Sequence, residues 1–272
     1  MTQWVRFRTG DGRVGFGVLD DGLVTEYDGN VFDEPKGTGA SLAPGSFTLL
    51  APCAPSKIVA LWNNFRELGA KLGKLPPTHP LFLLKPASSV AGPGDMIRRP
   101  AAYKGRIAFE GELGIVIGKH CRELSVSDAA NAIFGYTCVN DVTAGDLLNE
   151  NADFAQWCRS KGCDTFGCIG PVIASDFDWS QARVVTTVDG VERQNYPLSD
   201  MIFSPAEQVS RISHDMSLLP GDVIACGTSV GVGSIKDGST VVVTIEGIGS
   251  LQNRLAPGPG ASTAPMSRAT VA

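Results

Sequence analysis

Two glutamates separated by a single residue are the first place in this sequence where chemistry is expected. Glu110 and Glu112 lie in the run FEGELGIVI (109–117), whose apolar residues are typical of a strand. Side chains two positions apart share one face of a strand, so the two carboxylates should lie together, while Gly111 leaves room on the opposite face. Carboxylates placed side by side raise each other's pKa unless a cation relieves them, and a hard divalent ion does so effectively.

A bare pair of this kind is more often the solvated outer face of a strand. A third carboxylate changes the interpretation, because Asp141 stands in NDVT (140–143), just past a strand expected at 136–139. Three carboxylates with open coordination positions suit Mg²⁺ or Mn²⁺, which keep waters and accept oxygen ligands from a substrate. The sequence therefore predicts a divalent-metal site made by Glu110, Glu112 and Asp141.

Two more segments carry groups suited to an anionic substrate. Lys161 opens KGCDTFG (161–167) and is placed to meet a carboxylate or enolate, although alone it is an ordinary loop lysine. The run PGDVIACGTSVGVG (220–233) places Thr228 and several backbone N–H groups in a glycine-rich loop that can hold an anion. No GK[ST] follows it and no GxGxxG opens a helix, so we do not interpret it as a nucleotide site.

The elements that must position these residues are mainly strands. We expect hairpins in residues 2–28, a linker at 33–55 with one short strand at 46–50, a short helix starting at Asn63 or Asn64, and a disordered tail at 257–272. Further strands are expected at 57–62, 80–86, 109–117, 134–139, 184–188, 223–226 and 240–246, and helices at 127–132 and 205–212. This pattern favours an α+β, mainly β architecture over a repeating βαβ sheet.

Composition excludes several classes of protein. With 272 residues, 43% hydrophobic and 19% charged, the chain has the make-up of an ordinary globular protein. A net charge of −5 argues against a sequence-independent nucleic-acid partner. No signal segment or apolar run of about 20 residues is found, so we expect a cytoplasmic protein with no membrane partner.

Cys158, Cys163 and Cys168 lack a CxxC pair, and we interpret them as core residues rather than a metal or redox site.

Taken in order, these motifs resemble the fumarylacetoacetate hydrolase superfamily, which contains acylpyruvate hydrolases, oxaloacetate decarboxylases, and the isomerases and decarboxylases of homoprotocatechuate breakdown. The resemblance covers roughly residues 56–257 and rests on SKIV (56–59), LKP (84–86), EGEL (110–113), NDVT (140–143), KGCDTFG (161–167), GP (170–171), RQ (193–194), PGDVI (220–224) and GT (227–228). It implies a mixed β-sandwich roll of the fumarylacetoacetate hydrolase C-terminal type at 56–256, a small N-terminal β module at 1–50, and a homodimer.

The resemblance also implies the site. Mg²⁺ or Mn²⁺ is expected on Glu110, Glu112 and Asp141. Lys161 is expected to be a catalytic residue that contacts the substrate, and the substrate-binding residues are expected to be Thr228, Gly227, Gln194 and Asn64. A small 2-oxo acid would chelate the ion through its carboxylate and keto oxygens, and the ion would stabilise an enolate as the next bond breaks. We predict a hydrolase that cleaves a C–C bond in a 2,4-dioxo acid of the acylpyruvate or fumarylpyruvate type. The alternatives are a decarboxylase or isomerase/tautomerase of a 2-oxo dicarboxylate or an aromatic meta-cleavage product, and a non-catalytic metal-binding homologue.

One departure concerns the lid. Members of the family often carry Asn-Tyr-x-x-His-x-x-Glu there, with His and Glu acting on a water or a proton. Aligned on Asn64 and Phe65, this chain has Leu68 and Lys71 at those two positions. Glu67, one residue away and about 100° around a helix, is the remaining candidate for proton transfer. We interpret the three histidines, His79, His120 and His214, as surface or structural residues, and the missing lid histidine favours the decarboxylase or isomerase alternative.

Overall fold

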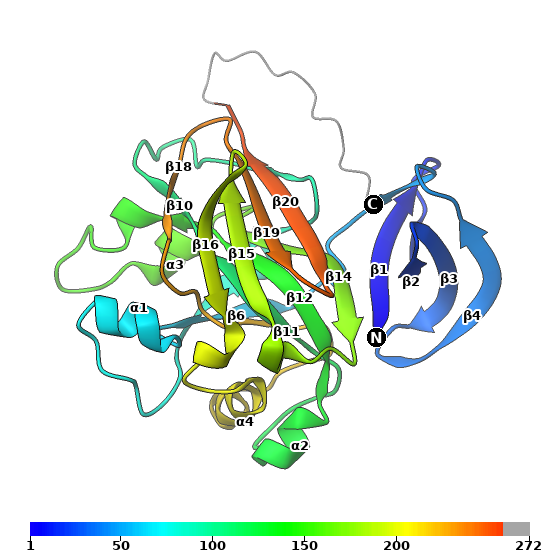
Figure 1. Ribbon diagram of the computed structural model, residues 1–272, viewed down its shortest axis with the longest axis horizontal. Coiled ribbons are helices and arrows are strands. Elements are labelled where there is room, and N and C mark those ends of the chain that lie inside the picture. The colour runs from blue at the N-terminus through cyan, green and yellow to red at the C-terminus, as the bar shows by residue number, and fades with distance from the viewer. Residues whose placement is uncertain (258–272) are drawn as a thin grey trace.

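The computed structural model describes residues 1–257 and builds three β-sheets in them (Figure 1). The main path of the 12-stranded sheet runs β4-β3-β2-β1-β14-β12-β11-β17-β6-β7; β5 pairs with β1, and β8 with β14. A five-stranded sheet has the order β16-β15-β19-β20-β9, and a three-stranded sheet has the order β13-β10-β18. The mixed, mainly β architecture predicted from the sequence is confirmed.

The bounds of the elements are as follows. The strands are β1 (Thr2–Thr9), β2 (Val14–Asp20), β3 (Leu23–Asn30), β4 (Asp33–Leu42), β5 (Phe47–Leu49), β6 (Lys57–Trp62), β7 (Leu81–Pro86), β8 (Val90–Ala91), β9 (Met96–Ile97), β10 (Ile107–Phe109), β11 (Gly111–Ile117), β12 (Ile133–Asp141), β13 (Thr143–Ala144), β14 (Gly167–Ser175), β15 (Arg183–Val188), β16 (Val191–Pro197), β17 (Val223–Ala225), β18 (Gly233–Ile235), β19 (Thr240–Ile245) and β20 (Gly249–Leu255). The α-helices are α1 (Arg66–Lys71), α2 (Val126–Ala130), α3 (Trp157–Lys161) and α4 (Pro205–Asp215). Short 3₁₀ turns are η1 (Ala87–Ser89), η2 (Gly145–Leu147), η3 (Trp179–Gln181) and η4 (Leu198–Asp200).

The N-terminal strands stand to one side of the molecule in Figure 1 but belong to the large sheet. β1 pairs with β14 in the antiparallel sense, with Trp4 opposite Ile173. The linker expected at 33–55 is wrong over Asp33–Leu42, which forms β4. This strand is exposed and rich in small residues, so it shows no apolar alternation, and backbone pairing with β3 alone defines it. The short strand expected at 46–50 is confirmed as β5.

Helix α1 is shorter than predicted, and asparagine does not cap it. It begins after Phe65, and the N–H of Glu67 in its first turn donates to Asp200 Oδ2 at 3.0 Å. The side chain of Asn64 is used elsewhere, since its Nδ2 donates to the Cys226 carbonyl at 2.8 Å and its Oδ1 accepts the Phe203 N–H at 3.0 Å. Serine caps begin the two other predicted helices: Ser125 for α2, and Ser204 for α4.

The core lies between the large sheet and the five-stranded sheet. Leu113 and Ile115 of β11 pack there with Val184 of β15 and Val243 of β19. On the other face of the large sheet, Val116, Val139 and Ile58 form a second buried cluster with their neighbours. β11 therefore separates two interiors, and its even-numbered side chains are directed away from the five-stranded sheet.

The three cysteines expected in the core differ in their burial. Cys168 is buried as expected of a core residue, but Cys163 is only half-buried and Cys158 is exposed, so the interpretation of all three as core cysteines is wrong. Cys158 lies in the short helix α3, and Cys163 follows two residues after its end. None of the helices in residues 1–257 is long and apolar enough to cross a membrane. The tail expected at 257–272 falls outside the described residues after position 257.

Candidate active site

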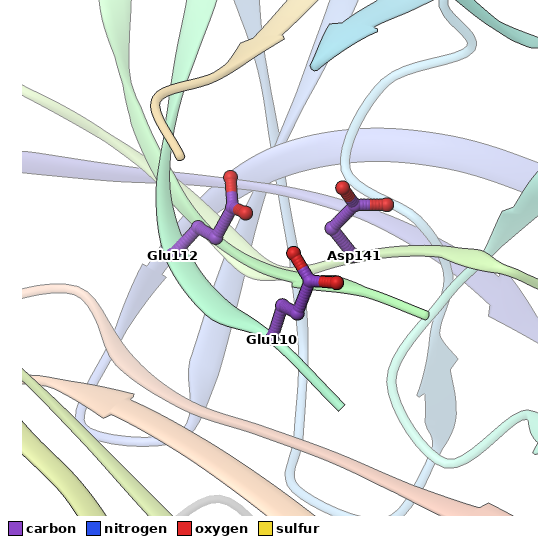
Figure 2. Close-up of side chains that lie close together, drawn as sticks. All are labelled: Glu110, Glu112 and Asp141. Carbon is purple, nitrogen blue, oxygen red and sulfur yellow. The ribbon is translucent and has the colours of Figure 1, made fainter. Parts of the chain in front are cut away.

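Strand register brings the three predicted carboxylates together. β11 and β12 run antiparallel with Gly111 opposite Asn140, and the Asp141 N–H donates to the Glu110 carbonyl at 2.8 Å. Glu110 and Asp141 are thus directly opposite on one face, and Glu112 lies two positions along on that same face. One oxygen from each carboxylate lies within 4.8 Å of the other two. Figure 2 shows the three groups gathered around one shared space.

Burial excludes the interpretation of this face as a solvated outer surface. Glu112 is 0% exposed and Asp141 1%, and only Glu110 reaches solvent. Oε2 of Glu112 accepts the Gly227 N–H at 2.8 Å, while its Oε1 is buried without a hydrogen-bond partner. Burial, followed by the charges of Asp141 and Glu110, holds the pKa of Glu112 well above its usual range. A buried oxygen left unpaired among three hard oxygen donors fits a ligand of a divalent cation such as Mg²⁺ or Mn²⁺.

Two lysines flank the carboxylates. Lys161 Nζ lies 2.8 Å from Glu110 Oε1 and 2.6 Å from Asp141 Oδ2, while the ammonium of Lys85 contacts Asp141 Oδ1. Burial alone would raise the pKa of Asp141, but the charges of Lys161 and Lys85 outweigh it and the pKa is lowered. Burial alone would lower the pKa of Lys161, yet the charges of Asp141 and the glutamates raise it. Lys161 is therefore a cation at neutral pH.

Lys85 is a site residue that the sequence reasoning did not assign. It stood within the LKP motif only as part of the family resemblance. The signal was a lysine inside the otherwise apolar strand LFLLKP, where a charge has to be paired if the strand is buried. Nothing in the sequence alone indicates that its partner is Asp141, because 56 positions separate the two residues.

A set of hydrogen bonds holds the backbone between the two glutamates. The N–H of Gly111 donates to Gln194 Oε1 at 3.0 Å, and the Gly111 carbonyl accepts from Tyr196 at 2.6 Å and from Thr228 at 3.0 Å. Gln194 Nε2 in turn donates to Thr228 Oγ1 at 2.8 Å. The side chains of Gln194, Tyr196 and Thr228 thus fix the two peptide groups on either side of Gly111, which join Glu110 to Glu112. The role of Tyr196 was not predicted, because its strand β16 was not.

The predicted substrate contacts surround this centre. Gly227 lies against Glu112 through its N–H, and Thr228 and Gln194 lie against Gly111. Asn64 holds the loop before Gly227, since its amide group bonds to the carbonyl of Cys226 and the N–H of Phe203. Their contacts with a substrate stay predictions, whereas their contacts with the site backbone are observed.

The residues at the positions expected for the lid are more exposed than the carboxylates. Glu67 and Lys71 on α1 are exposed, and Leu68 is half-buried. All three histidines, His79, His120 and His214, are exposed, in agreement with their interpretation as surface residues. Within residues 1–257, the potential metal-ligating group of three or more acidic, histidine or cysteine side chains is the one formed by Glu110, Glu112 and Asp141.

The fold and the site define a mainly β protein with a buried acidic centre between two lysines. Comparison with known proteins places it: the chain belongs to the fumarylacetoacetate hydrolase family. The family model described as "Fumarylacetoacetate (FAA) hydrolase C-terminal" matches residues 57–256, and the model "Rv2993c-like, N-terminal" matches residues 2–52. Members of this family include enzymes that act on small organic acids.

Three members of the family are similar to this chain over most of its length. Protein Rv2993c of Mycobacterium tuberculosis is 43% identical over 225 residues, 82% of this chain and 83% of that protein. Oxaloacetate tautomerase YisK of Bacillus subtilis is 36% identical over 214 residues, 74% of this chain and 70% of that protein. The crystal structure of 2-hydroxyhepta-2,4-diene-1,7-dioate isomerase from Mycobacterium marinum, 38% identical, has a TM-score of 0.86 and covers 96% of this chain and 100% of its own.

Proposed function

We propose that this protein is a divalent-metal-dependent enzyme that converts a small 2-oxo acid through its enolate. The observation that carries the proposal is the buried, unpartnered Oε1 of Glu112 beside Glu110 and Asp141. All three side chains offer hard oxygen donors, which favours Mg²⁺ or Mn²⁺ over softer metals. The cation would supply positive charge that polarises the keto oxygen of the substrate and lowers the energy of the enolate.

The charge of the centre supports an anionic substrate. With a divalent cation bound and all three carboxylates ionised, the cation and the ammonium groups of Lys85 and Lys161 leave the centre with one net positive charge. Lys161 is the lysine with some solvent exposure, 6% for its side chain against 0% for Lys85. Because the ammonium of Lys161 donates to Glu110 and Asp141 at the partly exposed side of the centre, we expect it to bind and orient a substrate oxygen there.

Tautomerisation or isomerisation is the reaction that the site supports best. Both reactions need proton transfer but no activated water, and the lid carries Leu68 and Lys71 where hydrolytic relatives often have His and Glu. The described histidines are all exposed. The names of the two relatives, an oxaloacetate tautomerase and a dienedioate isomerase, agree with this choice. The C–C hydrolase predicted from the sequence becomes the second candidate, and Glu67 stays a proposed proton-transfer residue in either case.

A spectrophotometric assay separates the candidates. The purified protein is given oxaloacetate, an acylpyruvate and a 2-hydroxy-dienedioate, each with Mg²⁺, with Mn²⁺ and with EDTA. Metal-dependent exchange between the enol and keto absorbances without release of pyruvate or CO₂ supports the tautomerase. Release of pyruvate from the acylpyruvate supports the hydrolase instead. Asp141→Ala should abolish either activity while the far-UV circular dichroism stays native, and unchanged turnover in this variant would refute the site.

The oligomeric state and the cellular location are two further properties expected from the sequence. We propose that the protein forms a homodimer, which light scattering behind a gel-filtration column tests directly by mass. A cytoplasmic location also stays a prediction.

A further inference from the structure

A lysine on an edge strand turns its side chain into the acidic centre. Lys85 belongs to β7, the last strand of the large sheet, where Leu81 and Leu84 are exposed. Lys85 itself is 0% exposed, and it stands opposite Ile58 of β6, a member of the buried cluster on the same face as the carboxylates. A fully buried ammonium group is costly unless it is paired, so its partners indicate what it does.

The partners of Lys85 are Oδ1 of Asp141 and, at 3.1 Å, the carbonyl of Val142. Lys161 contacts the other oxygen of Asp141, Oδ2, from the exposed side of the centre. The two lysines thus approach Asp141 from different sides and use different oxygens. The carboxylate cannot rotate without breaking both ion pairs.

We propose that Lys85 is a positioning residue of the metal centre. It holds Oδ1 of Asp141 from the interior, while Oδ2 lies beside Lys161, which also contacts Glu110 and is the lysine that can reach a substrate. The two lysines therefore have separate tasks: the buried one orients a metal ligand and the partly exposed one binds the anion. This inference rests on the proposed function, since it assumes that Asp141 binds the cation.

The direction in which metal affinity changes when Lys85 is replaced tests this proposal. Removal of a positive charge beside a cation would by itself tighten binding of that cation, because like charges repel. Loss of a group that orients a metal ligand has the opposite effect, commonly weakening metal affinity about 10- to 100-fold. Lys85→Met removes the charge and nearly keeps the volume. In a titration at a pH where Asp141 stays ionised in both proteins, weaker binding then follows from lost orientation of Asp141 or from altered folding.

A matched control removes the second explanation. Lys57 on the neighbouring strand β6 forms an ion pair with buried Asp222, away from the carboxylates. Lys57→Met therefore deletes a comparable lysine from the same hairpin. We expect it to lower stability in urea and to leave metal affinity within about twofold of the natural protein.

The experiment is titration of the metal-free protein with Mn²⁺ in a calorimeter, with near-UV circular dichroism as a check of the fold. We expect Lys85→Met to raise the Kd for Mn²⁺ about tenfold or more, and an unchanged or lower Kd overturns the inference. If the methionine variant does not fold, Lys85→Gln, which is shorter and uncharged, takes its place and its result is judged in the same way. If the natural protein binds no Mn²⁺, or Asp141→Ala binds it equally well, the proposed function fails; if both behave as expected and Lys85→Met still binds normally, only the inference fails.

Discussion

A side chain at position 111 would meet the hydroxyl oxygen of Thr186, because a Cβ built on Gly111 lies 2.0 Å from Thr186 Oγ1. Thr186 belongs to β15 of the five-stranded sheet, so the two sheets approach at Gly111 too closely for a side chain there. The glycine between the two glutamates is therefore required by packing on the face opposite the carboxylates. This agrees with the sequence-based expectation that Gly111 leaves room there.

Gly111→Ala should consequently damage the metal site without touching a ligand. The added methyl group would push the backbone between Glu110 and Glu112 away from Gln194 and Thr228. We expect the Kd for Mn²⁺ to rise about 10-fold or more and the free energy of unfolding to fall by about 1–3 kcal/mol. Gly233→Ala is the control, because a Cβ there makes only an ordinary 3.5 Å contact with Phe109. Equal metal affinity in the two variants would contradict the prediction.

The raised pKa of Glu112 predicts that metal binding releases a proton. Burial and the neighbouring carboxylates keep this group protonated above its usual pKa of 4.5, whereas a cation binds the ionised form. Metal affinity should therefore increase with pH, by up to about tenfold per pH unit below the raised pKa and less above it. In the metal-free protein the same shift makes stability fall as pH rises through the folded-state pKa, since the folded protein binds the extra proton.

Calorimetry in two buffers of different ionisation enthalpy measures this proton directly. We expect up to one proton released per Mn²⁺ at a pH below the raised pKa of Glu112. Glu112→Gln should abolish both the release and most of the affinity. A binding enthalpy that is independent of the buffer throughout the acidic range would show that Glu112 is already ionised and would refute the prediction.

The site was more predictable than the contacts that hold it. Spacing alone placed Glu110 and Glu112 on one face, and Asp141 was added because it lies just past the end of a strand, while the register that sets it opposite Glu110 was not predicted. The hydrogen bonds of Gln194 and Tyr196 to Gly111 depend on how two sheets pack, which no local pattern specifies. The strand that carries both residues, VERQNYP, has no long apolar run and was not predicted.

The secondary-structure elements also divide into those that could be predicted from the sequence and those that could not. The bounds of β6 matched because KIVALW is an almost continuous apolar run with its ends marked by polar residues. β4 was mistaken for a linker because its exposed small residues bury no face, and α3 was missed because its five residues are too few to show a helical period. Elements stabilised by their own burial pattern were found, and those stabilised by backbone pairing or tertiary contacts were not.

Asp222 predicts a purely structural effect of pH and mutation. Its carboxylate accepts hydrogen bonds from Ser56, from Lys57 and from the Leu219 N–H at 2.9 Å. Burial would raise its pKa, but the hydrogen bonds from Lys57 and Ser56 outweigh burial and the pKa is lowered. Because the pKa of Asp222 is lower in the folded protein than its usual value of 3.8, the ionised carboxylate stabilises the fold at pH values above 3.8. This stabilisation is lost as pH falls through the folded-state pKa.

Asp222→Asn should lower the free energy of unfolding at pH 7 by about 2–4 kcal/mol, because it leaves Lys57 without its charged partner. Urea unfolding of the variant and the natural protein at pH 7 and at pH 3 measures the difference. We expect the gap between the two proteins to narrow at pH 3, and a gap that is the same at both pH values would show that the charge of Asp222 contributes nothing. Affinity for Mn²⁺ should not change, since Asp222 contacts none of the three carboxylates in the described hydrogen bonds.

The proposal that Glu67 transfers a proton makes a prediction specific to the lid. Glu67 is exposed in the first turn of α1, and its backbone N–H donates to Asp200 Oδ2 at 3.0 Å. If it is the general acid or base, Glu67→Gln should lower kcat about 10²-fold with little change in KM and remove one limb of the pH–rate profile. Glu246→Gln, at another exposed glutamate, should leave both unchanged. A Glu67→Gln enzyme that keeps its kcat and its pH profile would assign proton transfer to another group and leave α1 with a covering role only.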